Sequence, residues 1–142
     1  MTATTRPVPS PSDWSAPFWS AARQKRLVYQ VCGQCGAATL YAKRICPNCL
    51  ADALSWRDAS GQGEVYTYTQ QVAGAPSGFA DLVPYVIAVV RLDEGVQLMS
   101  NIVGPEASSV QCGDRVTADF YTVPGTDMVL PVFTLDRAHV SA

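Results

Sequence analysis

Four of the five cysteines form two pairs, Cys32 with Cys35 and Cys46 with Cys49, and two residues separate the members of each pair. Such a gap lets both thiolates of a tight turn reach one ion about 2.3 Å away, and two such turns complete a tetrahedron of sulfur. The ten residues between the pairs are fewer than the roughly 15–20 of the common pattern, yet enough for a short hairpin. The spacing therefore predicts a zinc ribbon.

Other roles for the paired cysteines fit the sequence less well. A redox-active pair usually stands alone and opens a helix in a βαβ setting. Disulfides would suit a secreted chain, but residues 1–8 contain no apolar run of the kind that a signal peptide has. Iron also binds four thiolates, so the choice between zinc and iron stays open. We expect structural zinc, because four protein sulfurs leave no open coordination position for catalysis.

The remaining residues offer little for catalysis. His139 is the only histidine and lies close to the C-terminus. Cys112 is the one unpaired cysteine, and we expect neither a helix start nor a cation beside it to lower its pKa. Gly61 and Gly63 precede an expected strand, whereas a phosphate-binding loop precedes a helix. We therefore expect no catalytic set in this chain.

Charge is divided unevenly along the chain, although the formal net charge is only −2. Residues 1–51 hold six basic residues and one acid, whereas residues 52–142 hold four arginines and eleven acids. Either these charges are merely solvated, or the basic part meets an anion such as a phosphate-bearing ligand or an acidic partner. The candidates for such contacts are Arg23, Lys25, Arg26, Lys43 and Arg44.

A tail and a helix precede the first cysteine pair. Residues 1–12 are rich in Thr, Ser and Pro and are expected to form a mobile tail. A short helix should follow, with a cap among residues 12–15 and an end near Lys25. Its aromatic side chains either complete the chain's own core or are buried against another subunit. They are Trp14, Phe18 and Trp19.

Strands are expected in the rest of the chain. Short strands should flank the cysteine pairs at residues 27–31, 39–42 and 53–59. Five further runs are rich in Val, Tyr, Thr and Ile and bounded by Gly, Pro and Asp: Glu64–Val72, Tyr85–Leu92, Val96–Val103, Arg115–Val123 and Met128–Leu135. Five strands with no helical pattern between them predict a small closed barrel and a mainly β fold. We divide the chain into a tail with a helix (1–26), a zinc ribbon (27–60) and a barrel (61–142).

The same architecture occurs in nucleic-acid-binding proteins, which gives a second functional hypothesis. Tyr66 and Tyr68 lie on one face of an expected strand, where they could stack on bases. The net charge of −7 over residues 52–142 would, however, repel a phosphate backbone. No run approaches the roughly 18 apolar residues that a membrane-spanning helix needs, so we expect a soluble, cytoplasmic protein.

The sequence also resembles a known family: stand-alone proteins formerly grouped as a domain of unknown function, with a rubredoxin-like zinc ribbon and a C-terminal OB-fold. The resemblance covers nearly all of the chain after residue 12. The matching segments are Pro17–Trp19, Arg26–Val28, Cys32–Gly36, Cys46–Cys49, Gly61–Thr69, Pro84–Gly95, Gly113–Val116 and Leu130–Phe133. The chain departs from the family at Tyr41–Arg44, where relatives commonly have a proline and an aromatic residue.

The resemblance implies a five-stranded OB-fold barrel, structural zinc and a non-catalytic role. Members of this family are accessory subunits of thiolase-like enzymes of lipid metabolism, including thiolases and lipid-transfer-type aldolases, and related modules accompany acyl-CoA hydratases. Their ribbon and helix contact the catalytic partner and help to shape the CoA site. The resemblance thus implies that the basic candidates contact CoA or the partner and that the three helix aromatics face the partner. A free-standing acyl-CoA-binding protein is a further alternative.

Overall fold

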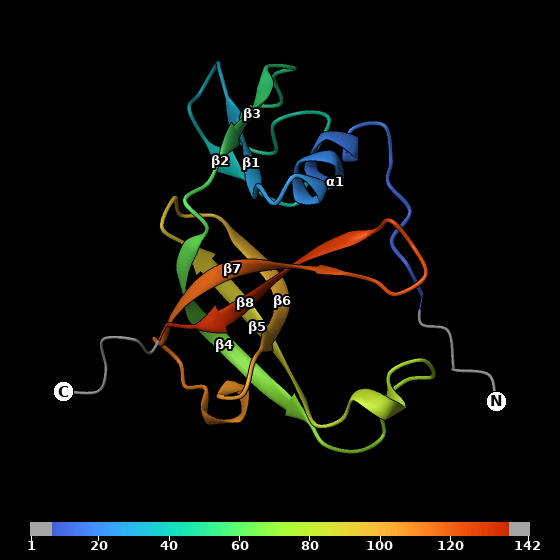
Figure 1. The fold of residues 1–142 in the computed structure, drawn as a ribbon. Helices are drawn as coiled ribbons and strands as arrows, with labels where there is room; N and C mark the ends of the chain where they lie inside the picture. The colour runs from blue at the N-terminus through green and yellow to red at the C-terminus, as the bar shows by residue number, and fades with distance from the viewer. Residues whose placement is uncertain (1–6, 137–142) are drawn as a thin grey trace.

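The computed structural model describes residues 7–136, in which a small three-stranded sheet and a helix sit against one side of a closed barrel (Figure 1). The sheet has the order β2-β1-β3. Its elements, with the helix, are α1 (Ala16–Arg23), β1 (Val28–Cys32), β2 (Ala38–Thr39) and β3 (Leu54–Asp58). The barrel strands are β4 (Gln62–Gln71), β5 (Tyr85–Leu92), β6 (Gln97–Val103), β7 (Arg115–Thr122) and β8 (Val129–Leu135). The predicted mainly β fold class and five-stranded barrel are confirmed.

The helix is short and follows a hydrogen-bonded turn. In this turn Ser12 N donates to Ser15 Oγ over 2.8 Å and Ser15 N donates to Ser12 Oγ over 3.2 Å, while the N-cap residue Ser15 makes no side-chain bond to the helix itself. Trp14 therefore belongs to the turn before α1, although its spacing is helical. The helix ends two residues earlier than predicted, because Lys25 has a φ of 61°. No helix within residues 7–136 is long and apolar enough to cross a membrane.

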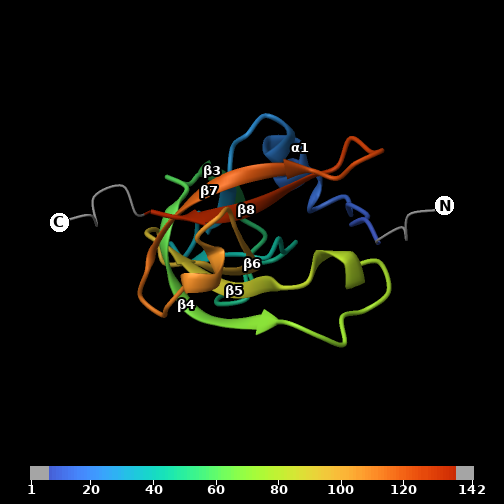
Figure 2. The same ribbon diagram turned by 60° about the horizontal axis from the view of Figure 1, so that its bottom comes forward.

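The barrel closes in the order β4-β5-β6-β8-β7 (Figure 2). Neighbouring strands are antiparallel except β6 and β8, which run parallel where Ile102 faces Phe133. Strand β5 is buried at every second residue from Val86 to Leu92, as expected for a strand with one face on the core. Phe133 is fully buried and belongs to this core.

The ribbon and the barrel share part of one core. Leu27, which precedes β1, is 4% exposed and belongs to the barrel's buried cluster. Ser60 N, in the connection to β4, donates to Glu94 Oε2 of the β5–β6 hairpin over 2.8 Å. On another side, Met99 N of β6 donates to the Tyr41 hydroxyl over 2.7 Å. These contacts fix the position of the ribbon on the barrel.

One glycine is required by the close approach of two strands. Gly63 of β4 pairs with Leu92 of β5, and a β-carbon there would overlap the Arg91 carbonyl oxygen. We expect Gly63→Ala to lower the free energy of unfolding by about 1–3 kcal/mol, the usual cost of overpacking. Urea unfolding measures this loss. Thr69→Ala, at an exposed position of the same strand, is the control and should lower it by less than about 1 kcal/mol; equal losses would contradict the prediction.

Candidate functional site

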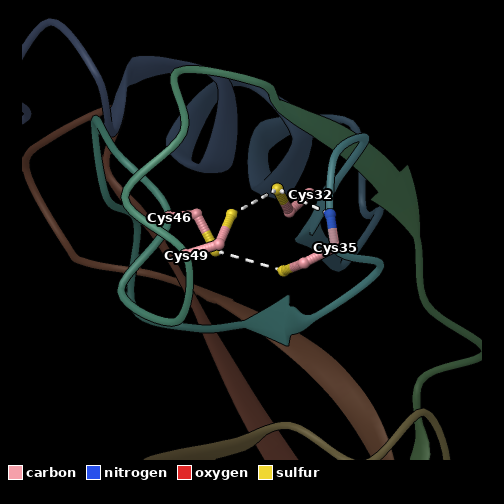
Figure 3. Close-up of side chains that lie close together, drawn as sticks. All are labelled: Cys32, Cys35, Cys46 and Cys49. Carbon is pink, nitrogen blue, oxygen red and sulfur yellow. Dashed lines mark hydrogen bonds between the residues drawn. The ribbon is translucent and has the colours of Figure 1, made fainter.

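The two cysteine pairs occupy equivalent turns that face each other (Figure 3). In the first turn Gly36 N donates to Cys32 O, and in the second Leu50 N donates to Cys46 O, each over 2.9 Å. The residue after each pair is in the left-handed region, with φ 78° at Gly36 and 67° at Leu50. Both pairs therefore close the same kind of knuckle, once with glycine and once with leucine.

The spacing of the sulfur atoms fits one metal ion. Cys32 Sγ lies 3.6 Å from Cys49 Sγ, and Cys35 Sγ lies 3.7 Å from Cys46 Sγ. All four sulfurs lie within 4.8 Å of one another. Sulfurs at the corners of a tetrahedron with metal–sulfur distances of about 2.3 Å lie about 3.8 Å apart, whereas a disulfide needs about 2.05 Å. The predicted cysteine cluster is thus positioned to hold a metal ion.

Nitrogen donors surround the sulfurs and favour their ionised form. Gln34 N donates to Cys32 Sγ and Asn48 N donates to Cys46 Sγ, each over 3.3 Å. The side-chain amide of Asn48 also donates to Cys35 Sγ over 3.4 Å, which links the two knuckles. This bond is the main cause that lowers the pKa of Cys35 to about 6.

Four thiols this close together cannot all ionise without a cation. A hydrogen bond from the Ala51 backbone favours the Cys49 thiolate. Burial and the neighbouring cysteine sulfurs oppose it and together raise the pKa of Cys49 to about 12. A bound metal ion supplies the missing positive charge and displaces the remaining thiol protons.

A buried glutamine positions the chain that leads to the second knuckle. Gln30 of β1 is 3% exposed, and its side-chain amide nitrogen donates to Lys43 O over 2.9 Å. Its amide oxygen accepts from Lys43 N over 2.8 Å. This paired contact holds the backbone of the segment that departs from the family pattern. Strand β2 accordingly ends at Thr39, three residues earlier than predicted.

The predicted basic residues do not form one cluster. Arg23 pairs with Asp127 of the β7–β8 loop, with an N–O distance of 3.3 Å, and Arg26 pairs with Asp58 at 2.6 Å. Both pairs are at the surface, where such contacts contribute little stability. Lys25 and Arg26 line a cavity between the ribbon and the barrel. That these side chains contact CoA or a partner stays a prediction.

Aromatic residues of the helix region divide between the core and the surface. Phe18 packs against the barrel core and meets Trp19 edge to face, with ring centroids 5.0 Å apart. Trp14 is 45% exposed, and the Arg44 guanidinium lies 5.7 Å from its ring centroid, within range of a cation–π interaction. Contact of Trp14, Phe18 and Trp19 with a partner stays a prediction.

Two exposed apolar side chains flank the second cysteine pair and were not among the predicted contacts. Ile45 is 49% exposed and Leu50 is 75% exposed. Their position beside Cys46 and Cys49 is the signal that could have identified them, because exposed apolar side chains that lie together mark interaction surfaces. Two residues had been considered for catalysis. Cys112 lies in an exposed loop, and His139 lies outside the described residues.

Comparisons with known proteins agree with this architecture. The family model of the ChsH2 rubredoxin-like zinc ribbon domain matches residues 19–55, and that of the ChsH2 C-terminal OB-fold domain matches residues 56–121. A DUF35 domain-containing scaffold protein of Methanothermobacter thermautotrophicus is 36% identical over 94 residues, which cover 65% of this chain and 69% of the relative. These matches confirm the resemblance and the OB-fold assignment.

Two further similarities involve proteins named for acyl-CoA chemistry or aldolase assembly. A probable enoyl-CoA hydratase alpha subunit of Thermomonospora curvata is 35% identical over 128 residues, 90% of this chain. This chain spans only 39% of that protein's length. A chain of the Ltp2-ChsH2(DUF35) aldolase superposes with a TM-score of 0.78 at 31% identity, covering 89% of this chain and 98% of that chain.

We expect the purified protein to contain one zinc ion per chain. Cys35→Ser should remove most of the metal and lower the thermal unfolding temperature, because metal binding is coupled to folding of the ribbon. Elemental analysis and thermal unfolding measure these effects. Cys112→Ser is the matched control and should change neither, since Cys112 lies outside the sulfur cluster. Full zinc content in the Cys35 variant would contradict the assignment.

Zinc retention should also depend on pH. Metal binding requires thiolates, so protons compete with the metal and its affinity falls as the pH is lowered. Zinc should be held at neutral pH and released progressively as the pH falls below neutrality. A zinc-sensitive dye in a pH titration measures the release. Asn48→Ala removes a donor to Cys35 Sγ and should move the release to higher pH; release at an unchanged pH would refute this role of Asn48.

Proposed function

The chain belongs to the ChsH2 (DUF35) family, and we propose that it is a non-catalytic accessory subunit of a thiolase-like enzyme that acts on acyl-CoA. The observation that carries this proposal is the similarity to the Ltp2-ChsH2(DUF35) aldolase chain, because it extends over nearly the whole of both chains. The scaffold name of the Methanothermobacter thermautotrophicus relative supports the same role. The catalytic partner would be a thiolase or a lipid-transfer-type aldolase, and it would supply the reacting groups.

The chemistry of the metal centre supports a structural task for this subunit. Four cysteine sulfurs complete a tetrahedral shell, so a zinc ion held there has no position left for substrate or water. The ion would stabilise the ribbon, which is too small to depend on apolar packing alone. Function is then expected at the surface that the metal holds in shape.

The second knuckle supplies the partner surface in this proposal. Leu50 adopts a left-handed backbone conformation, which costs a non-glycine residue about 1–2 kcal/mol, and it also exposes its apolar side chain. Glycine stands at the equivalent position of the first knuckle. In the free chain Leu50 is thus unfavourable both for its backbone conformation and for its exposed apolar side chain. Burial of Leu50 and Ile45 by the catalytic partner would explain why leucine stands there.

The predicted contacts complete the proposed interface. The helix aromatics Trp14, Phe18 and Trp19 are proposed to contact the partner, Trp14 most directly because it is the most exposed of them. The basic side chains are proposed to contact CoA or acidic groups of the partner. They are Arg23, Lys25, Arg26, Lys43 and Arg44.

The nucleic-acid alternative has less support. Tyr66 and Tyr68 are exposed on β4, as base stacking would require. However, the Arg91 guanidinium lies 4.4 Å from the centroid of the Tyr66 ring and covers one of its faces. The acidic barrel sequence adds repulsion for a phosphate backbone.

Purification from the native organism tests the proposed partnership. With a small tag on the chromosomal copy, the chain is expected to co-purify in a defined ratio with a thiolase-like or aldolase subunit. Mass spectrometry identifies the partner, and the purified complex should break or form a carbon–carbon bond in the acyl chain of an acyl-CoA thioester. Recovery of the chain as a lone monomer, or with nucleic acid instead, would refute the proposal.

The Leu50 contact can be tested without damage to the fold. Leu50→Gly should raise the free energy of unfolding of the isolated chain by about 1 kcal/mol, because glycine accepts the left-handed backbone. The same substitution should weaken the complex, measured as faster dissociation from the immobilised partner. Val72→Ala is the control, since Val72 is 66% exposed after β4 and lies outside the ribbon. Unchanged dissociation of the Leu50 variant would exclude this residue from the interface.

A further inference from the structure

The second half of β4 leaves one edge of the barrel sheet unpaired. Residues 62–64 of β4 pair with β7, and Val65 then bonds through its N and O to Asp114 and Gly113, which precede β7. Beyond Val65, β4 pairs with β5, and no strand of residues 7–136 pairs with its other side. Every residue from Tyr66 to Gln70 is exposed. This segment, Tyr66–Gln70, is named the β4 edge.

Backbone groups of the β4 edge are directed toward the unpaired side. In an antiparallel ladder, alternate residues direct their N–H and C=O groups to opposite neighbours. Leu92 N of β5 bonds across the β5–β6 hairpin, so Leu92 and alternate residues before it face β6. The residues between them face β4 and meet it at Thr67 and Thr69. Tyr68 and Gln70 therefore present their N–H and C=O groups to a further strand.

The sequence does not protect this edge with charge. No charged residue occurs from Val65 to Ala80, although 15% of the chain is charged. Exposed edges are usually blunted by charged side chains, proline or a bulge. The one such device here is the bulge between Val65 and Thr67, where the unpaired segment begins. Tyrosine and threonine alternate after it, and both favour strands. The β4 edge is thus suited to strand addition.

The charges at the two ends of the β4 edge favour a second copy of this chain in antiparallel orientation. Glu64, at the start, pairs in the ladder with Arg91 and Arg115, and Asp114 lies beside Val65. The other end is followed only by uncharged residues as far as residue 80. An antiparallel copy places each charged start against an uncharged end, whereas a parallel copy would place acid against acid.

The same orientation matches the side chains of the two copies. A two-fold axis perpendicular to the sheet at Tyr68 places this residue opposite Tyr68 of the second copy. It places Thr67 opposite Thr69 of the second copy. Aromatic pairs and Thr–Thr pairs across an antiparallel ladder are stabilising. The contact is isologous, so it closes at two copies.

The limits of the edge define how strong this association can be. Pairing stops at Val65, where Gly113 and Asp114 already occupy the ladder. A contact of five residues in each strand belongs with interfaces below about 1,200 Å², which are typical of transient association. The end of β4 lies on the opposite side of the barrel from the ribbon (Figure 1). Pairing there leaves the ribbons of both copies accessible.

We propose that two copies of this chain pair through their β4 edges, antiparallel across a two-fold axis at Tyr68. One sheet then continues from the first barrel into the second. The two ribbons face away from each other, so each can meet its own catalytic partner. This self-association is a property of the isolated chain and does not depend on the proposed function.

Sedimentation velocity of the zinc-loaded full chain, from micromolar to millimolar concentration, tests the proposal. The chain should change from monomer to dimer across this range. Amide hydrogen exchange at Tyr68 and Gln70 should slow as the dimer forms, because the new ladder bonds protect these groups. A chain that stays monomeric throughout would overturn the proposal. Protection of these amides only in a complex with a catalytic subunit would assign the edge to that subunit and would also overturn it.

Opposite charges at the axis identify the surface. Tyr68→Lys and Tyr68→Glu should each weaken self-association at least about fivefold, because like charges then face each other across the ladder. An equimolar mixture of the two variants should associate more tightly than either alone. Met99→Lys is the control, since Met99 is 61% exposed on β6, and it should dimerise as the unmodified chain does. Zinc content and thermal unfolding verify that each variant is folded. Equal weakening by Met99→Lys, or no gain in the mixture, would refute the two-fold pairing.

Discussion

Mutual repulsion among four thiolates, and its relief by one cation, is the constraint on which the ribbon depends. The sulfurs lie within 4.8 Å of one another, and burial together with the neighbouring sulfurs opposes ionisation of Cys49. Around an ion, the same sulfurs would cross-link the two knuckles, which the Asn48 side chain also joins. The three ribbon strands are short, so the metal contributes what a large apolar core contributes in the barrel.

The ribbon in turn fixes the surfaces that a partner or ligand would meet. Two contacts anchor the ribbon to the barrel. Leu27 is buried in the barrel core, and the Tyr41 hydroxyl accepts a hydrogen bond from Met99 N. Because the helix end, the second knuckle and β7 all keep a fixed geometry, strain at Lys25 and Leu50 persists. Both positions favour glycine, and both carry large side chains that are directed to the surface of the molecule. Two chemically different side chains, one cationic and one apolar, therefore stand on the same left-handed backbone conformation.

Local chemistry made much of this molecule predictable from its sequence. The cysteine spacing defines the knuckles, and β-branched and aromatic runs between turn residues define the barrel strands, so both could be predicted. The left-handed backbone conformation of Lys25 could not be predicted, because lysine has no preference for it. The predicted helix was therefore two residues too long. Contacts between distant segments could not be predicted from local sequence patterns either. Examples are the hydrogen bond from Ser60 N to Glu94 and the ion pair between Arg115 and Asp93. The cavity and the exposure of Leu50 likewise emerge only when the ribbon and barrel are assembled.

Strand β8 follows the other barrel strands in sequence, which constrains the order in which the parts of the fold can form. The four ribbon cysteines precede residue 50, so both knuckles are synthesised before every barrel strand and can bind metal first. β4 and β5 can pair as a hairpin soon afterwards, but the barrel stays open until β8 joins β6 to β7. The helix α1 also packs against β8, so this packing can form only after β8 has been synthesised. A chain without β8 could thus bind metal at the knuckles, but it would lack the closed barrel on which the ribbon sits.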